Sequence, residues 1–390
     1  MPERTIYLDH AATTALDPRV LDAMLPYLTT EYGNASSIYT LGRHAMQALD
    51  NSREQVAELL HCRSNEVAFL GCGSESDNLA IKGVAFASQK KGNHLITSSI
   101  EHHAVLHTCQ YLDRFGFKTT YLPVDEYGLV NPDDVGRAIT DQTVLISIIY
   151  ANNEVGTIEP IAEIGRICRA RKIPFHVDAV QAAGGTLPID VTALNVDLLS
   201  LSAHKFYGPK GVGILYVRQG TRMLPQLQGG SQERGRRAGT ENVAGIIGAT
   251  SAIRLAYEEA PHVRPRIQAL RDRLIEGILK IPHSRLTGHP AERLPSNASF
   301  CFEGVEGESI LLNLDMLGIA ASSGSACTSG SVEPSHVLVA MGLAPEWSHG
   351  SLRLSLGKEN TEEDVERVIS VLAGVVEKLR GLGLLGAAES

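Results

Sequence analysis

Lys205 and Asp178 are the two charged residues whose positions most clearly suggest chemistry. Each follows an apolar run that we expect to be a strand, Val196–Leu201 before the lysine and Pro174–Val177 before the aspartate. A partly desolvated lysine amine among small and aromatic residues is a good nucleophile toward an aldehyde cofactor. A carboxylate beside a pyridine nitrogen keeps that nitrogen protonated, so that the ring can accept electrons. The pair therefore favours a site for pyridoxal phosphate.

Each residue has a simpler explanation when it is taken alone. Lys205 could be a surface lysine before the turn at residues 208–211, and Asp178 could cap the helix that follows it. The occurrence of both at strand ends favours the cofactor hypothesis. Gln181 lies about one helical turn beyond Asp178 and could reach a ring hydroxyl.

Residues 71–78, GCGSESDN, connect the predicted strand Glu66–Leu70 to the predicted helix Asn78–Ser88. Glycines allow the backbone to approach a phosphate closely, and a helix N-terminus attracts anions. Gly73 and Ser74 are therefore candidate phosphate ligands, although any tight turn could have this composition. The segment does not match G-x-x-x-x-G-K-[ST], so a nucleoside-triphosphate loop is not expected.

Two further strand ends carry candidate cofactor residues. His102 follows the predicted strand His94–Ser98 and could stack on the ring and transfer protons, whereas we expect His103 to point elsewhere. Asn153 follows the strand Val144–Tyr150 and could hydrogen-bond the ring oxygen. Asn-Glu-x-Gly is equally an ordinary turn sequence, so Asn153 is ambiguous by itself.

Cys327 lies within residues 322–335, SSGSACTSGSVEPS, a stretch rich in serine and glycine. We expect a mobile surface loop with an exposed thiol that can approach a bound substrate and then swing outward. An incidental loop cysteine is the alternative. No cysteine pair has C-x-x-C spacing, so no metal site is expected, and most of the others should be small buried residues in a reducing compartment; they are Cys62, Cys72, Cys109, Cys168 and Cys301.

Two residues are candidates for binding the substrate. Arg353 is a lone cation on the predicted strand Ser351–Leu356, and its guanidinium could bind the carboxylate of an amino acid. A structural salt bridge explains it equally well. Asn34, within Gly33–Ser37, could also face the substrate.

The elements that must position these residues alternate between apolar strands and helices from about residue 50 to 250. Such a pattern predicts a mostly parallel sheet covered on both faces, with the site at the carboxyl ends of its strands. The remaining predicted elements of this part are strands Lys118–Leu122 and Gly213–Val217 and helices Ala104–Arg114 and Ile161–Arg171.

At 390 residues the chain exceeds the usual size of a single core, so we expect two domains. The large domain comprises residues 15–258, and the small one comprises residues 1–14 and 259–390. The small domain should contain strands Asn297–Phe302, Ile310–Leu314 and Ser351–Leu356. Its helices are Ala249–Ile281, which Pro261 and Pro265 should interrupt, and Thr361–Leu379, which Thr361 should cap, with residues 381–390 frayed.

Composition is that of a soluble globular protein, with 43% hydrophobic and 20% charged residues. The N-terminus lacks the layout of a signal peptide, and no apolar run reaches about 18 residues, so no membrane span is expected. A net charge of -9 argues weakly against broad nucleic-acid binding, without excluding a local basic patch. We expect a cytoplasmic enzyme.

Taken together, the segments resemble cysteine desulfurases of the NifS/IscS class, a resemblance that covers about residues 5 to 375. It rests on motifs that occur in the family's order: LDHAATT (8–14), GNASS (33–37), EH (101–102), NNEVG (152–156), HVDAVQ (176–181), SAHK (202–205), RRAGTEN (236–242), SGSAC (323–327) and RLSLG (353–357).

The resemblance implies the fold of aspartate-aminotransferase-like, pyridoxal-phosphate-dependent transferases (fold type I) and a homodimer that acts on L-cysteine. By motif match, Lys205 forms the Schiff base and Cys327 carries a persulfide. The other matched roles are His102 stacking on the ring, Asp178 at the ring nitrogen, Asn153 and Gln181 near the ring oxygen, Ser74, Ser202 and His204 at the phosphate, and Thr240 reaching the phosphate of the partner subunit.

The long segment around Cys327 is similar to that of the group whose mobile loop delivers sulfur to an acceptor protein, such as an iron–sulfur scaffold. Gly73-Ser74 departs from the Ala-Thr of many relatives but keeps the hydroxyl. An aminotransferase, a selenocysteine lyase and a non-catalytic scaffold stay open as alternatives. The acceptor is also open between iron–sulfur assembly, tRNA thiolation and nitrogenase maturation.

Overall fold

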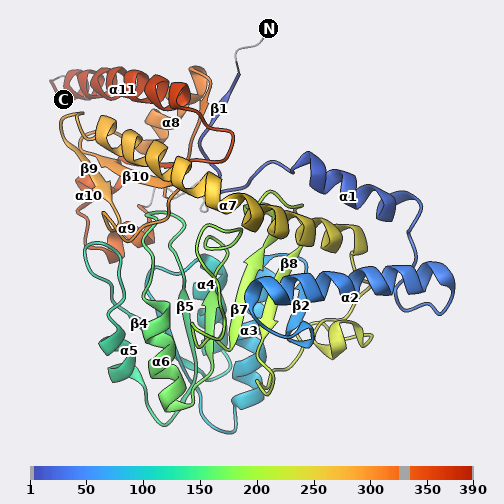
Figure 1. Cartoon of the computed structure of the whole chain (residues 1–390). Coiled ribbons are helices and arrows are strands. Elements are labelled where there is room, and N and C mark those ends of the chain that lie inside the picture. Colours follow the sequence, from blue (N-terminus) through green and yellow to red (C-terminus); the bar gives the residue numbers. More distant parts are fainter. Residues whose placement is uncertain (1–3, 325–333, 389–390) are drawn as a thin grey trace.

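The structure, a computed structural model, describes residues 4–324 and 334–388, and the side chains up to residue 381 (Figure 1). Its largest sheet has seven strands in the order β2-β8-β7-β6-β5-β3-β4. The strand β8 is antiparallel to both of its neighbours, and the other pairs are parallel. The strands are β2 (Val67–Leu70), β3 (His94–Ser98), β4 (Lys118–Leu122), β5 (Thr143–Ile149), β6 (Phe175–Asp178), β7 (Leu198–Ser202) and β8 (Gly213–Val217). All seven predicted strands are confirmed, as is the α/β fold class.

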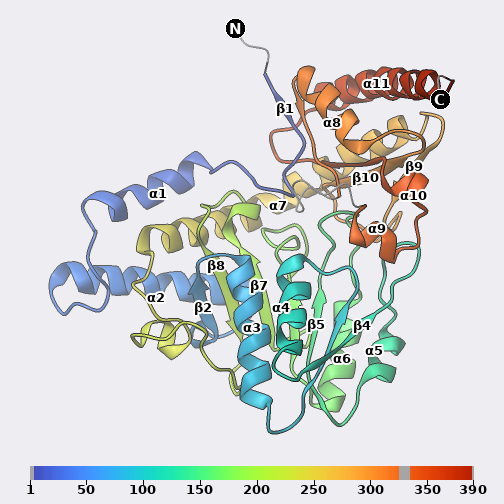
Figure 2. The same ribbon diagram turned by 180° about the vertical axis from the view of Figure 1, so that it is seen from behind.

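Helices cover both faces of this sheet. Figure 2 shows α3 (Gly73–Ser88) and α4 (His103–Asp113) on one face, and Figure 1 shows α2 (Thr40–Leu60), α6 (Ile161–Arg171) and α7 (Val243–Ile278) on the other. Successive strand residues point to opposite faces. Leu145 of β5 accordingly packs in the cluster of α3 and α4, and Ile146 packs in the cluster of α2, α6 and α7. This double covering explains why the central strands β5, β6 and β7 are buried along nearly their whole length, whereas the edge strand β4 is largely exposed.

The remaining elements complete the chain around the main sheet. Two short sheets are formed by β12-β10-β9, all antiparallel, and by the parallel pair β1-β11. Their bounds are β1 (Ile6–Tyr7), β9 (Ser284–Thr287), β10 (Asn297–Phe302), β11 (Ile319–Ala320) and β12 (Ser351–Ser355). The other helices are α1 (Pro18–Thr29), η1 (Ser64–Glu66), α5 (Pro132–Ala138), η2 (Ala203–Lys205), η3 (Gln232–Gly235), α8 (Gly307–Met316), α9 (His336–Ala340), α10 (Pro345–Ser348) and α11 (Glu362–Ala388).

The helix α7 continues through Pro261 and Pro265, so the predicted interruptions are wrong. The two prolines are four residues apart and exposed, so the backbone hydrogen bonds that they remove lie on the solvent side. The buried face is held at both ends of the helix. Ile246 and Ile253 pack on the main sheet, while Ile267 and other residues near the C-terminal end pack in a second core.

Two other predictions about the C-terminal part are wrong. Residues 310–314 form part of α8 instead of a strand, because Ile310 and Leu314 are buried four residues apart while Leu312 is exposed. A short apolar run does not distinguish a strand from a buried helix segment. The helix α11 extends to Ala388, although residues 381–390 were expected to fray. Its predicted cap at Thr361 is confirmed by reciprocal hydrogen bonds with Asp364.

The second core joins the N-terminal residue Leu8 to α7, β10, α8, β12 and α11. This grouping agrees with the proposed small domain of residues 1–14 and 259–390. The proposed boundary at residue 258 falls inside the continuous helix α7, and the division itself stays a prediction.

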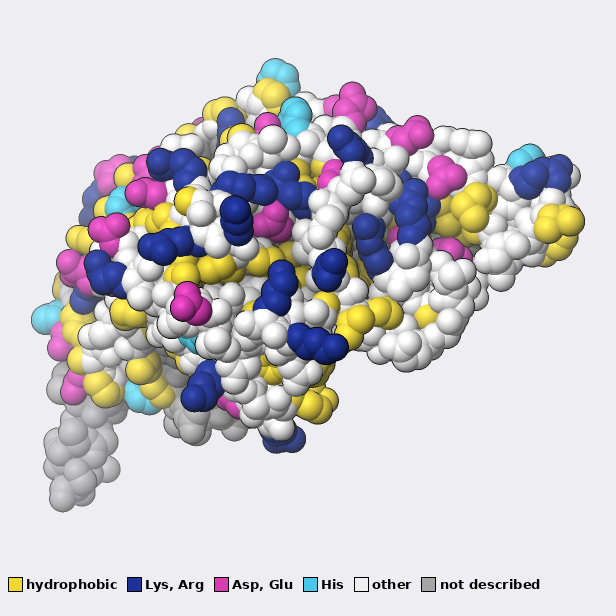
Figure 3. Space-filling model, turned by 90° about the horizontal axis from the view of Figure 1, so that it is seen from below, with side chains coloured by type: hydrophobic (Ala, Val, Ile, Leu, Met, Phe, Trp, Pro, Cys, Tyr) yellow, Lys and Arg dark blue, Asp and Glu magenta, His cyan; other side chains and the backbone are white. Residues whose placement is uncertain are grey.

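Charge is distributed unevenly over the surface. Lys and Arg side chains gather on the face in Figure 3, which is the underside of the molecule in Figure 1. The negative net charge therefore does not describe every face, and the expectation of no nucleic-acid binding stays a prediction. Among the residues described, no helix is long and apolar enough to cross a membrane.

Candidate active site

Lys205 lies at the end of η2, directly after the carboxyl end of β7. Its Nζ donates to the carbonyl oxygens of Ala11 and Ala12 at 2.6 and 2.7 Å. Burial raises the pKa of Asp178 and lowers the pKa values of His102 and His204; the positive charge of Lys205 opposes the first shift and adds to the other two. Because such charge effects act over short distances, the fold has brought four predicted site residues to one place from three strand ends, those of β3, β6 and β7.

Asp178 is the last residue of β6 and is 3% exposed. Its Oδ1 accepts a hydrogen bond from the backbone N–H of Val180 at 3.0 Å. Burial raises the pKa of Asp178 to about 6, against the lowering effects of that hydrogen bond and of Lys205. A buried carboxyl group of this kind gains from a cationic partner, as a protonated ring nitrogen would be.

His102 is the N-cap of α4, and its Nδ1 accepts from the backbone N–H of Ala104 at 3.1 Å. Burial and, to a smaller extent, the charge on Lys205 lower the pKa of His102 to about 4. The ring is therefore neutral near pH 7, with its proton on Nε2, because Nδ1 is an acceptor. A neutral imidazole suits stacking on a flat ring.

Gly73 and Ser202 form the floor of the expected phosphate cradle at the start of α3. The backbone N–H of Gly73 points to Ser202 Oγ at 3.4 Å. A Cβ at residue 73 would lie 3.0 Å from Val180 Cγ2 and 3.2 Å from Ser202 Cβ, so a larger residue would require its neighbours to shift. Ser74 is exposed on the first turn of α3, where its hydroxyl and the helix N-terminus can face an anion.

His204 and Gln181 are both tied to the N-terminal segment. His204 Nδ1 lies 3.1 Å from Thr13 Oγ1, and burial lowers the pKa of its ring to about 4. Gln181 Nε2 donates to the carbonyl oxygen of Ala11 at 2.9 Å, the same oxygen that Lys205 contacts. Residues 11–13 therefore organise the lysine, the glutamine and the histidine together.

Arg353 is 4% exposed and has two partners in the described part of the chain. Its Nη2 pairs with Asp9 Oδ1 at 2.8 Å, and its Nη1 donates to the carbonyl oxygen of Asn153 at 3.1 Å. The structural salt bridge that was the alternative explanation for Arg353 is therefore present. Its Nε is buried and has no hydrogen-bond partner among the residues that the structure describes. A substrate carboxylate would have to share this guanidinium with Asp9.

Asn34 and Thr240 are both exposed. The Oδ1 of Asn34 accepts from the backbone N–H of Ser36 at 2.9 Å, and Thr240 lies in the loop between η3 and α7. Exposure leaves both available to a neighbouring subunit. Cys327 lies outside the described residues. Of the other cysteines, Cys109, Cys168 and Cys301 are buried as expected, whereas Cys72 is exposed and caps α3.

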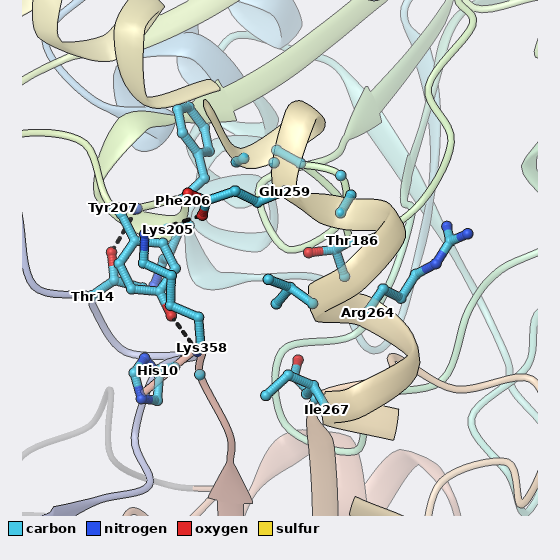
Figure 4. A pocket seen from close by; sticks show the side chains of 18 of the residues that line it. His10, Thr14, Thr186, Lys205, Phe206, Tyr207, Glu259, Arg264, Ile267 and Lys358 are labelled. Carbon is cyan, nitrogen blue, oxygen red and sulfur yellow. Dashed lines mark hydrogen bonds and ion pairs between the residues drawn. The ribbon is translucent and has the colours of Figure 1, made fainter. Parts of the chain in front are cut away.

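A cavity of about 990 Å³, counting its part open to solvent, lies beside Lys205 (Figure 4). The N-terminal segment and α7 line much of it, and Tyr207 and Lys358 contribute a cation–π contact of 4.4 Å. Its lining includes Lys205 and Gln181 but not Asp178, His102 or Ser202. We place the cofactor with the latter group, because the buried carboxylate and the anion cradle lie there.

A buried polar network behind the site was missed from the sequence. His176 Nδ1 and Nε2 lie 2.8 and 2.9 Å from the hydroxyls of Ser147 and Ser200, and Asp77 Oδ1 is 3.6 Å from His176 Nε2. Burial and the charge of Asp178 raise the pKa of Asp77. Strand periodicity could have revealed this network. His176 precedes Asp178 by two residues, so both side chains face the same side of β6.

Comparison with known proteins assigns the arrangement to a family. The family model of class-V aminotransferases matches residues 6–368. A cysteine desulfurase IscS of Methanosarcina thermophila is 55% identical over 386 residues, which cover 99% of this chain and 95% of the relative. One from Dictyoglomus turgidum is 52% identical, covering 97% and 96%. The chain belongs to the cysteine desulfurases of the class-V aminotransferase family.

Solved structures of the family agree with this fold. A NifS-like protein matches with a TM-score of 0.91 at 38% identity, covering 96% of this chain and all of that one. A structure described as SspA in complex with cysteine matches with a TM-score of 0.81 at 37% identity, covering 92% of this chain and all of the other. The sequence resemblance and the expected fold type are thereby confirmed.

Cysteine desulfurases of this family depend on pyridoxal phosphate, and the residues of this chain fit that group. Lys205 provides the amine for the aldehyde, and the buried Asp178 provides the partner for the ring nitrogen. The first turn of α3 at Gly73 lies against Ser202 and Val180, where its backbone N–H can meet an anion. Nothing in this donor set conflicts with the cofactor.

Proposed function

We propose that this chain converts L-cysteine to L-alanine and takes up the sulfur as a persulfide on Cys327. The observation that carries the proposal is the convergence of Lys205, Asp178 and His102, which lie on separate strand ends and share one electrostatic environment. The relatives named cysteine desulfurase and the neighbour solved with cysteine support the substrate.

The overall chemistry balances without any other reactant. The Cβ–Sγ bond of L-cysteine breaks, and an S–S bond forms between the substrate sulfur and Cys327. The proton lost by the Cys327 thiol balances the hydrogen gained by the new methyl group of alanine, and the terminal sulfur keeps its own hydrogen. Bound pyridoxal phosphate supplies an electron sink next to the substrate Cα. A later thiol acceptor regenerates Cys327 by taking the terminal sulfur.

Within this scheme the chain's own residues hold charges and move protons. Lys205 Nζ removes the Cα proton, and the Asp178 carboxylate stabilises positive charge on the ring nitrogen. His102 stacks on the ring as a neutral imidazole and manages the proton of the substrate thiol. Asn153 and Gln181 bind near the ring oxygen, and the phosphate is held by Gly73, Ser74, Ser202 and His204.

We also propose a homodimer in which Thr240 of one subunit reaches the phosphate bound by the other. Its support is the exposure of Thr240 and of an apolar face on α1, a helix that packs along α7 (Figure 1). Leu21, Leu25 and Leu28 are spaced by four and three residues on α1 and are all exposed. An apolar helical stripe of this kind is typical of an interface.

Three finer assignments complete the proposal. Asn34 and Arg353 bind the substrate, with the carboxylate at the guanidinium. The sulfur passes to an acceptor protein such as an iron–sulfur scaffold, and the relatives named cysteine desulfurase IscS support such an acceptor. The enzyme is cytoplasmic, in line with its unpaired cysteines among the described residues.

The test is to purify the protein with its cofactor and to assay alanine and sulfide from L-cysteine without an added keto acid. We expect one alanine for each sulfur released in the presence of a thiol. Cys327→Ser should retain the visible absorbance of the bound cofactor and lose sulfide release. Full sulfide release by that variant would contradict the assignment of Cys327, and alanine formation that requires a keto acid would indicate an aminotransferase.

A further inference from the structure

Glu154 is a buried carboxyl group that the proposed reaction does not use. It is 6% exposed and follows β5 in the turn that also contains Asn153. The backbone of this turn is fixed, because Asn152 Oδ1 accepts from the N–H groups of Glu154 and Val155 at 2.8 and 3.0 Å. Asn297 Nδ2 also donates to the carbonyl oxygen of Glu154 at 3.1 Å. The direction of the side chain is therefore set by a well-anchored turn.

Two residues that are distant in sequence meet the Glu154 carboxylate. The Oγ of Ser335 donates a short hydrogen bond to Oε2. A Cβ added to Gly324 would lie 2.7 Å from the same oxygen and 3.2 Å from Ser335 Cβ, so Gly324 packs against both. Gly324 and Ser335 flank the part of the chain that contains Cys327. The carboxylate thus joins the two described ends of that part.

The contact between Glu154 and Ser335 lies next to the residues proposed to bind the cofactor. Ser335 caps α9 by accepting from the N–H groups of residues 337 and 338. The next residue, His336, places Nε2 3.0 Å from the carbonyl oxygen of Glu101, and its ring centroid lies 4.7 Å from that of His103. His103 immediately follows the cofactor histidine His102. Ser335 is therefore followed by a residue that packs beside the turn carrying His102, while Ser335 itself contacts Glu154.

We propose that Glu154 is a positioning residue that holds both ends of the Cys327 segment against the carboxyl end of β5 and so keeps the thiol within reach of the substrate sulfur. This inference rests on the proposed role of Cys327. Tethering both ends shortens the effective span that the thiol explores, which raises its local concentration at the substrate. Burial raises the pKa of Glu154 to about 7, while the Ser335 hydrogen bond and the Arg353 charge lower it. Burying an acidic group is costly without a partner, so its hydrogen bond to Ser335 is needed to hold it there.

The first experiment measures persulfide formation in a single turnover of the holoenzyme, by mass spectrometry of the Cys327 peptide after mixing with L-cysteine. Glu154→Ala and Ser335→Ala should each slow this step by about tenfold, the loss expected when a tether is released. The cofactor spectrum and its response to L-cysteine should not change. Glu154→Gln should be close to wild type, because its amide oxygen can accept the same hydrogen bond.

Three further variants sharpen the result. The double variant of Glu154→Ala and Ser335→Ala should be no slower than Ser335→Ala alone, because both substitutions remove the same contact and only Ser335→Ala also removes the cap of α9. Gly324→Ala should resemble Glu154→Ala, because the added methyl group displaces the carboxylate. Glu159→Ala is the matched control, since Glu159 is 2% exposed and its Oε2 accepts from the backbone of Val130. It should lower the melting temperature without selectively slowing persulfide formation.

A second readout is independent of turnover. Limited proteolysis of the holoenzyme without substrate, followed by peptide mapping of residues 325–333, should proceed about tenfold faster in Glu154→Ala than in the wild type or Glu154→Gln. Wild-type persulfide and proteolysis rates in Glu154→Ala would overturn the inference, as would equal losses in Glu154→Gln and Glu154→Ala. A persulfide found on another residue would instead overturn the role of Cys327. In that case the proteolysis rates would still test whether Glu154 holds the two ends of the segment.

Discussion

Lys205 Nζ donates to the carbonyl oxygen of Ala11 at 2.6 Å, so the lysine proposed to hold the cofactor contacts the N-terminal segment of its own chain. The same oxygen accepts from Gln181, and Thr13 in the same segment contacts His204. The N-terminal segment in turn pairs through Asp9 with Arg353 of β12. A segment at the start of the chain therefore connects the main sheet with the strand that carries the candidate substrate arginine.

Replacement of Lys205 tests the central assignment. Lys205→Ala should abolish the visible absorbance of the covalently held cofactor and reduce turnover by about 10²–10⁴-fold or more, because both the amine nucleophile and the proton acceptor are lost. Absorbance spectra and alanine assays measure both effects. Lys210→Ala is the control, since Lys210 is exposed five residues away. Retention of wild-type absorbance in Lys205→Ala would exclude Lys205 as the cofactor lysine.

Asp178 should make the stability of the cofactor-free protein depend on pH. Burial raises its pKa to about 6, so the folded chain binds this proton more tightly than the unfolded chain does. As the pH rises through about 4 to 6, the unfolded chain loses the proton first, and the folded state loses stability. Asp178→Asn removes this penalty and should be about 1–3 kcal/mol more stable than wild type at pH 7.5, with no advantage at pH 4.

The same variant should fail in catalysis. Asp178→Asn loses the negative charge opposite the ring nitrogen, and turnover should fall by about 10²–10³-fold, as for other lost electrostatic stabilisers. Denaturant unfolding of the cofactor-free proteins and alanine assays of the loaded ones measure the two effects. A variant that is less stable than wild type at pH 7.5, or that turns over normally, would contradict this account of Asp178.

Variants of Arg353 and Asp9 distinguish a role of Arg353 in binding the substrate from a purely structural role. Arg353→Lys loses the planar fork and should raise the KM for L-cysteine by about tenfold, a difference of about 1.4 kcal/mol. Asp9→Asn removes the charge of the partner while leaving the guanidinium in place, so its KM should stay within about twofold. Steady-state kinetics and melting temperatures of both variants are compared. Equal increases in KM would show that Arg353 acts only through the structure it supports.

The prolines of α7 should limit the stability of the chain. Pro261→Ala and Pro265→Ala each restore a backbone N–H on the exposed side of a continuous helix and should raise the free energy of unfolding by about 1–3 kcal/mol. Pro132→Ala is the control, because Pro132 is the first residue of α5, where proline is favourable. Denaturant titration measures all three. A loss of stability in both α7 variants would mean that the prolines help to shape the helix.

The sequence by itself determined the main sheet and the residues at its edge. Mostly apolar runs were enough to predict six of its strands, because strands buried on both faces need apolar residues. The edge strand β4 has the more polar sequence KTTYL and was found from its β-branched and aromatic residues. Lys205, Asp178 and His102 could be selected because a polar residue directly after such a run must lie at the carboxyl edge, where parallel strands place their sites. These inferences use neighbouring residues only.

The tertiary structure decided which distant residues meet. The contacts of Lys205 with Ala11, of Arg353 with Asp9 and of Glu154 with Ser335 each join positions far apart in the chain, and no local pattern encodes such pairs. The apolar run at residues 310–314 was also resolved by packing, since burial of Ile310 and Leu314 on one side selects a helix. Local propensity is weak compared with the free energy of burial, so long-range packing makes these choices.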